Sequence, residues 1–160
     1  MATDSVTAAA IVTAARDWIG TPYQHQASLK GVGCDCLGLL RGVWRELRGA
    51  EPEAVPPYAR DWSEATGAET LRDALARHLK PADIGHLAPG DVVLFRMAHR
   101  SGRAPAKHCG IIGYANASLL ERDVGMHGGL TLIHARQNRR VSEEAFTAFW
   151  QARLAYSFRI

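Results

Sequence analysis

Cys36 is the residue whose surroundings best suit covalent chemistry. It lies in the run GCDCLGL (33–39), where an amphipathic segment begins. A thiol attacks as its thiolate, and a helix N-terminus lowers the thiol pKa from its usual value of about 8.5. Unpaired N–H groups at a helix start can also bind the oxyanion of a tetrahedral intermediate. An inert buried cysteine would fit the same position, so the run alone leaves both interpretations open.

A catalytic cysteine needs an imidazole, and the sequence offers seven histidines. His108 and His134 differ from the others because they lie in apolar runs typical of strands, HCGII (108–112) and LIHA (132–135). One strand can hold an imidazole against the thiol, and a second can place another behind it to orient the first. Two independent strand-end histidines would give the same pattern. The remaining five are His25, His78, His86, His99 and His127. We expect these five at the surface, with His25 able to line a substrate groove.

The residues just before Cys36 are predicted to have supporting roles. Cys34 precedes the helix start and is expected to be a small packing residue. Asp35 is suited to capping the helix, and it is not expected to be the base, because a carboxylate beside a thiol raises the thiol pKa. Three cysteines, two of them only two positions apart, do not form a disulfide framework, which favours synthesis in the reducing cytosol.

Helices are predicted in the first half of the chain. They cover residues 4–19, 36–48 and about 67–79, separated by loops at 20–34 and 50–66. Asp4 or Ser5 can cap the first helix, and Gly49 can end the second. The second helix has a wide apolar face and would carry Cys36 at its N-terminus.

Strands dominate the second half. Short β-rich runs bounded by turn residues predict strands at 91–97, 108–114 and 130–135. A final helix is predicted after Ser142, with Glu143 and Glu144 in its first turn, and a final strand at 154–160. Helices followed by consecutive strands indicate an α+β fold with an antiparallel sheet.

The composition is that of an ordinary folded domain. The 160 residues are 47% hydrophobic and 22% charged, which fits one domain spanning 1–160. The net charge of +3 could favour an anionic polymer, but no motif indicates nucleic-acid binding. No apolar run is long enough for membrane insertion, and residues 1–5 lack the features of a secretory signal.

Four segments occur in a fixed order between Ala15 and Ala135. They are GTPY (20–23), DCLGL (35–39), LAPGDVVLF (87–95) and the strand pair HCGI (108–111) and LIHA (132–135). In order and spacing they resemble the NlpC-type family of papain-like cysteine peptidases, which cut peptidoglycan. The resemblance implies that Cys36 attacks, that His108 is the base and later the acid, and that His134 orients His108. It also implies that Tyr23 contacts the substrate or helps to shape the oxyanion site. We expect Asp35, directly before the nucleophile, to contact the substrate as well.

The resemblance further implies the reaction. The family's substrate is the stem peptide of the cell wall, which is typically cut between γ-D-glutamate and a diamino acid. The reaction would proceed through an acylated Cys36 and would need no metal or organic cofactor. Leu37 stands where many members carry serine, and the Cys-Leu-Gly form is most similar to the phage-tail branch. The segment from Gly49 to Lys80 is long and is expected to form a specificity wall or a docking surface. Without a secretory signal or a wall-binding module, we expect delivery to the periplasm or cell wall within a phage or phage-like tail, bound to its other proteins.

Three alternatives remain at this level. A structural tail component could keep the fold with weak or no activity. A related amidase or acyltransferase could use the same cysteine and histidine on another substrate. A zinc site could recruit Cys34, Cys36, His108 and Cys109, although these pairs are closer than the spacing of common structural zinc sites.

Overall fold

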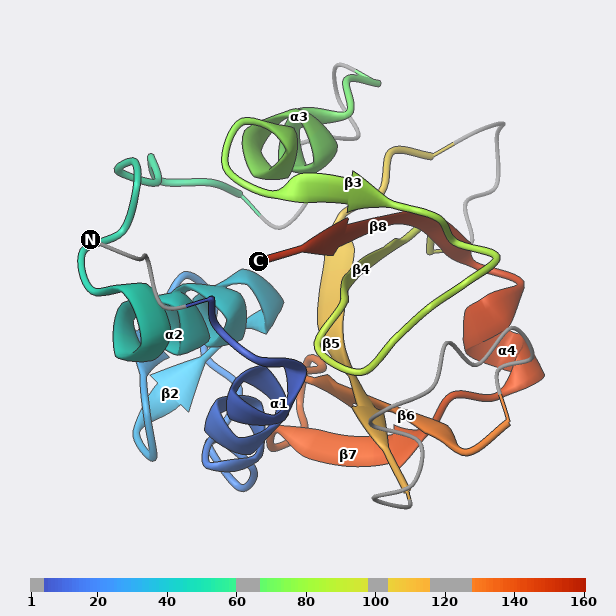
Figure 1. Cartoon of the computed structure of the whole chain (residues 1–160). Coiled ribbons are helices and arrows are strands. Elements are labelled where there is room, and N and C mark those ends of the chain that lie inside the picture. Colours follow the sequence, from blue (N-terminus) through green and yellow to red (C-terminus); the bar gives the residue numbers. More distant parts are fainter. Residues whose placement is uncertain (1–4, 60–66, 98–103, 116–127) are drawn as a thin grey trace.

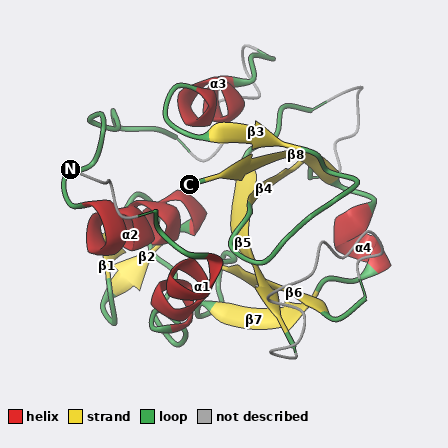
Figure 2. Cartoon of the chain, viewed as in Figure 1, coloured by secondary structure: helices red, strands yellow, loops and turns green. Residues whose placement is uncertain are grey.

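The computed structural model describes residues 5–59, 67–97, 104–115 and 128–160. Helices α1 (Ala8–Arg16) and α2 (Cys36–Arg48) come first along the chain and lie beside the sheet built by the later strands (Figure 1). Figure 2 shows the same separation of helical and strand segments. The prediction of an α+β fold with an antiparallel sheet is confirmed.

One six-stranded sheet forms the centre of the molecule. Its order is β3-β8-β4-β5-β6-β7, and every neighbouring pair is antiparallel. The strands are β3 (Lys80–Ala82), β4 (Val92–Phe95), β5 (His108–Tyr114), β6 (Leu130–His134), β7 (Ser142–Ala145) and β8 (Leu154–Arg159). The last strand along the chain, β8, lies between β3 and β4, so the C-terminal segment completes the sheet.

Both faces of the central strands are buried, which explains their almost continuous apolar sequences. One face packs against α1 and α2 through residues that include Val12, Leu39, Val43, Leu94 and Ile111. The opposite face packs against the short helix α4 (Ala148–Gln151) and neighbouring loops through Leu87, Phe95, Ile112, Leu132 and Trp150. The two histidine-bearing strands, β5 and β6, are therefore held from both sides.

The bounds of α2 are confirmed, because its end signals are local. Asp35 accepts a hydrogen bond from the Gly38 N–H at 2.7 Å, and Gly49 ends the helix at φ +84°, where glycine has no steric penalty. Helix α1 is shorter than predicted. Its cap is Thr7, whose Oγ1 accepts from Ala10 N–H at 3.1 Å, so Ser5 is not the cap and Asp4 lies outside the described residues.

Two predictions about secondary structure are wrong. The segment from Ser142 is strand β7, and Glu143 and Glu144 lie within it rather than in the first turn of a helix. The reason is tertiary: pairing with β6 outweighs a local sequence that favours a helix start. Helix α4 begins only after Thr147. In the other case α3 (Thr70–Ala76) stops before Leu79, and Lys80–Ala82 pairs with β8.

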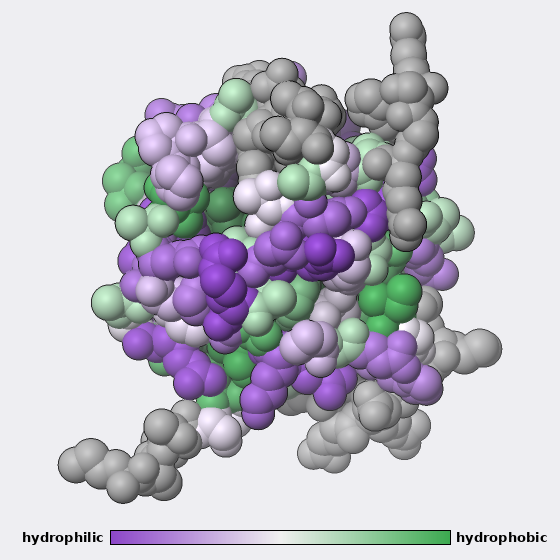
Figure 3. Space-filling view, turned by 90° about the horizontal axis from the view of Figure 1, so that it is seen from above, coloured by the Kyte–Doolittle hydropathy of each residue, from purple (hydrophilic) through white to green (hydrophobic). Residues whose placement is uncertain are grey.

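The loop predicted at 20–34 contains a small hairpin, β1 (Ser28–Leu29) with β2 (Gly33–Cys34), directly before the nucleophile helix. Within the described ranges, no helix is both long and apolar enough to cross a membrane. The face seen in Figure 3 carries mainly hydrophilic side chains in its described part, with hydrophobic residues in small separate patches.

Candidate active site

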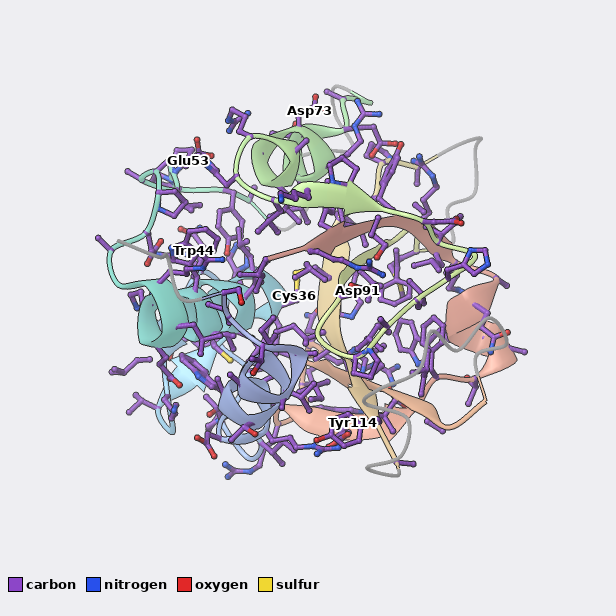
Figure 4. The ribbon with its side chains drawn as sticks, viewed as in Figure 1. Cys36, Trp44, Glu53, Asp73, Asp91 and Tyr114 are labelled. Atoms are coloured by element: carbon purple, nitrogen blue, oxygen red, sulfur yellow. The ribbon has the colours of Figure 1, made fainter. Side chains whose placement is uncertain are left out.

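Cys36 is the first residue of α2, and it lies between that helix and the sheet (Figure 4). Asp35 fixes the helix start through its bond to Gly38 N–H. The helix also needs glycine at position 38, because a Cβ there would lie 1.8 Å from the carbonyl oxygen of Ala27. The loop that precedes the helix therefore packs directly on its first turn, which holds Cys36 at a defined position.

The three thiols have different electrostatic environments. A hydrogen bond from the Cys109 thiol and then the neighbouring His108 hold the pKa of Cys36 well below its usual value, against the effect of burial. The same contact with Cys36, together with burial, raises the pKa of Cys109. Burial, followed by the charges of Asp35 and Cys36, raises the pKa of Cys34 to about 12. Of the three thiols, Cys36 is therefore the one whose surroundings favour the thiolate form. Cys34 is fully buried, in agreement with the expected packing role.

Two histidines and a glutamate form a hydrogen-bonded row beside this thiolate. His108 Nε2 lies 2.9 Å from His134 Nδ1, and His134 Nε2 lies 2.6 Å from Glu144 Oε1. The row runs across three adjacent strands, β5, β6 and β7. The structure thus brings Cys36, His108 and His134 together in the predicted order. Glu144 adds a further residue to this row, behind His134.

A tryptophan packs against both imidazoles. The Trp150 ring stacks on His108 at a centroid distance of 5.6 Å and meets His134 edge-on at 4.9 Å. His134 is fully buried, and this burial, then the charges of His108 and Arg136, lowers its pKa to about 3. His134 is consequently neutral over the range in which a thiol peptidase would work.

Sequence reasoning missed Glu144, Trp150 and the role of Cys109 as a thiol donor. The sequence did contain a hint for Glu144. If this segment is a strand, Glu143 and Glu144 point to opposite faces of the sheet, so one of them can face the histidines. Nothing local indicates that Trp150 reaches β5, because that contact depends on the fold.

A cleft of about 340 Å³ opens beside Cys36. Tyr23 and Asp35, the predicted substrate-contacting residues, line it, and so does His25. Two cationic residues, Lys107 and Arg136, line it as well. The cleft therefore offers both anionic and cationic groups next to the nucleophile.

Asp35 is more committed to the protein than the sequence suggested. Besides Gly38, it accepts from the Gln26 N–H at 2.8 Å and from the Tyr58 hydroxyl at 2.5 Å, and it is 3% exposed. Burial and the nearby Cys36 raise its pKa, although these hydrogen bonds oppose the shift. The contact also ties Tyr58 to the nucleophile helix. The described part of the long 49–80 segment thus forms one wall of the cleft.

The remaining histidines lie elsewhere. His78 contacts Glu53 at 3.2 Å and His86 contacts Asp83 at 2.6 Å, both away from the cleft. His99 and His127 lie outside the described residues. Across the described ranges, no group of three or more His, Cys, Asp and Glu side chains is arranged to hold a metal ion.

The fold and this site define a papain-like α+β protein with a cysteine at a helix N-terminus and histidines on the adjoining sheet. The NlpC/P60 family model matches residues 20–159, and the chain belongs to that family.

Solved structures share the fold at low sequence identity. The chain is similar to the NlpC/p60 domain of the peptidoglycan hydrolase SagA, with 20% identity, a TM-score of 0.59 and coverage of 97% of this chain and 100% of the other. It is also similar to an NlpC/P60 family protein from Bacillus cereus (21%, TM-score 0.59) and to NlpC2 from Trichomonas vaginalis (18%, TM-score 0.59). The two alignments cover 96% and 99% of this chain, but only 40% and 48% of those longer chains. No curated protein sequence matches the chain.

Proposed function

We propose that this protein is a cysteine endopeptidase that hydrolyses an amide bond in the stem peptide of peptidoglycan. The observation that carries the proposal is the Cys36 thiol at the start of α2, whose pKa its neighbours hold well below the usual value, beside the 2.9 Å contact between His108 and His134. Membership of the NlpC/P60 family and the likeness to the SagA hydrolase domain support the choice of substrate class.

The site residues have separate roles in this proposal. Cys36 Sγ attacks the carbonyl carbon, and His108 then gives its proton to the leaving amine, so the acyl group stays on the sulfur. Gly38 and Leu39 donate their N–H groups to Asp35, which leaves the N–H groups of Cys36 and Leu37 as helix-start donors for the oxyanion. Water activated by His108 then releases the second product, and His134 orients His108 throughout.

The charges of the cleft fit a stem peptide. Such a peptide carries both carboxylates and amines, and the cleft presents Lys107 and Arg136 along with Asp35. We assign the γ-D-glutamyl–diamino acid bond as the one cut, with Tyr23 and Asp35 contacting the substrate. No step of this reaction requires a metal or an organic cofactor.

We further propose that the protein acts as a component of a phage or phage-like tail, in the periplasm or at the cell wall. The Cys-Leu-Gly sequence at the nucleophile supports this assignment. The second candidate function is a structural tail component that keeps the peptidase fold with weak or no activity. The observation that favours it is Leu37, which lines the cleft at a position where many members of the family carry serine.

Digestion of purified sacculi, with the released peptides identified by mass spectrometry, tests the proposal. We expect the wild type to release stem-peptide fragments ending in γ-D-glutamate and Cys36→Ala to release none. Cys34→Ala is the matched control, because it removes a buried thiol two residues away, and it should retain activity. Cleavage that persists in Cys36→Ala would remove Cys36 from the mechanism, and a wild type without products would favour the structural role.

A further inference from the structure

Glu144 and Glu143 are neighbours on β7 but point to opposite faces of the sheet. Ser142 pairs with His134 in the register of β6 and β7, and Glu144, two residues on, reaches His134 Nε2 at 2.6 Å. Glu143 instead contacts Arg16 at 2.8 Å and Thr131 at 2.6 Å on the other face. Only Glu144 belongs to the row that leads to the nucleophile.

The row of hydrogen bonds fixes where the ring protons lie. A carboxylate only accepts hydrogen bonds, so the proton of neutral His134 is on Nε2, bonded to Glu144. Its Nδ1 is then a lone pair, which accepts from His108 Nε2–H across 2.9 Å. The nitrogen of His108 that remains for Cys36 is therefore Nδ1. If the proton of His134 moved to its Nδ1, His108 Nε2 would have to accept the hydrogen bond. The proton of neutral His108 would then lie on His108 Nδ1, the nitrogen that faces Cys36 and has to act as the base.

We propose that Glu144 is a positioning residue that sets the tautomer of His134 and, through it, the ring orientation and protonation of His108. This role rests on the proposed function of Cys36 and His108. Because its charge lies one ring behind His108, Glu144 also stabilises the imidazolium that forms when Cys36 is a thiolate. A buried neutral histidine could not supply that charge alone.

Other charged and titratable groups also face the row. They are Cys36 and Asp35 at the start of α2, Cys109 on β5, and Lys107 and Arg136 beside the cleft. Arg136 lies 3.8 Å from Glu144 Oε1 and over the Trp150 ring at 5.6 Å. Glu144 is the carboxylate hydrogen-bonded to His134, so its removal leaves the charge of Arg136 uncompensated at that end of the row, where it disfavours an imidazolium.

The tautomer can be measured without substrate, by long-range ¹H–¹⁵N NMR of histidine-labelled protein. We expect the wild type to show His134 protonated on Nε2, and Glu144→Ala and Glu144→Gln to show a mixture that includes Nδ1–H. Glu143→Gln is the matched control and should keep the wild-type pattern while losing its contact with Arg16. Wild-type His134 protonated on Nδ1, or an unchanged pattern in both Glu144 variants, would overturn the proposal.

Sacculus digestion against pH gives the second measurement. Glu144→Ala should digest roughly tenfold more slowly near neutral pH, since it loses part of the roughly 10²–10⁴-fold contribution of general acid–base catalysis. Its alkaline limb should move about one pH unit lower, because the imidazolium is less stable. A profile that overlays the wild type contradicts the role. If the wild type digests nothing, the proposed function fails, and the NMR result still decides the role of Glu144.

Discussion

The two sides of the cleft are held in different ways. On the strand side, His108 and His134 are fixed by the antiparallel ladder of β5, β6 and β7 and by the packing of Trp150. On the loop side, Tyr58 is held by a few side-chain contacts to Asp35 and its neighbours. Groups that must meet reacting atoms within a fraction of an ångström thus come from rigid elements, and the wall that meets the rest of the substrate comes from a loop.

Removing the base should give the largest effect. We expect His108→Ala to slow sacculus digestion by roughly 10²–10⁴-fold. It should also lower the free energy of unfolding by about 1–3 kcal/mol, because buried His134 Nδ1 loses its hydrogen-bond partner. His25→Ala removes an imidazole that lines the loop side of the same cleft, and it should reduce the rate far less, mainly through KM. Equal losses for the two variants would contradict the division between strand side and loop side.

Trp150 tests how the strand side is supported. It is 2% exposed and contacts both imidazoles, so Trp150→Ala should lower the free energy of unfolding by about 3–5 kcal/mol. The neighbouring Phe149 is 46% exposed, and Phe149→Ala should change the free energy of unfolding by at most about 0.5 kcal/mol. Urea unfolding measures both. A small loss for Trp150→Ala would mean that α4 is not needed to hold the histidines.

The acid stability of the protein should report on buried His134. Its pKa is about 3 when folded, against an ordinary value of 6.5, so below pH 6.5 the unfolded chain binds a proton that the folded protein does not. This group therefore destabilises the fold progressively as the pH falls from 6.5 toward 3, by about 2 kcal/mol between pH 7 and pH 5. Urea unfolding of the wild type and His134→Asn at both pH values checks this. The same pH dependence in both proteins would contradict it.

The loop side should give the smallest effect. Burial and the bond to Asp35 raise the pKa of Tyr58, so its hydroxyl stays protonated and donates. Tyr58→Phe removes this bond and should cost about 1 kcal/mol of unfolding free energy. We expect KM to rise more than kcat falls, because the wall loosens while the histidine row stays in place. A loss confined to kcat would place Tyr58 in the chemistry instead.

These differences also explain what the sequence could predict. The bounds of α2, and with them the position of Cys36, follow from Asp35 and Gly49, which act within a turn of the helix ends. The strands with His108 and His134 were recognisable because they are buried on both faces and hence apolar throughout. Glu144 was misassigned because its local sequence favours a helix start, whereas pairing with a strand some ten residues away decides its structure. The contacts of Trp150 and Cys109 depend likewise on how distant elements pack.

The central claim is that Cys36 alone of the three thiols is held as a thiolate by its neighbours. Alkylation by iodoacetamide across a pH series, with each cysteine followed by peptide mapping of the folded protein, tests it most directly. We predict that Cys36 reacts well below pH 8.5, the ordinary range of a free thiol, while Cys34 and Cys109 stay unmodified. Faster labelling of Cys34 than of Cys36 near neutral pH, or a Cys36 that reacts only above pH 8.5, would contradict it.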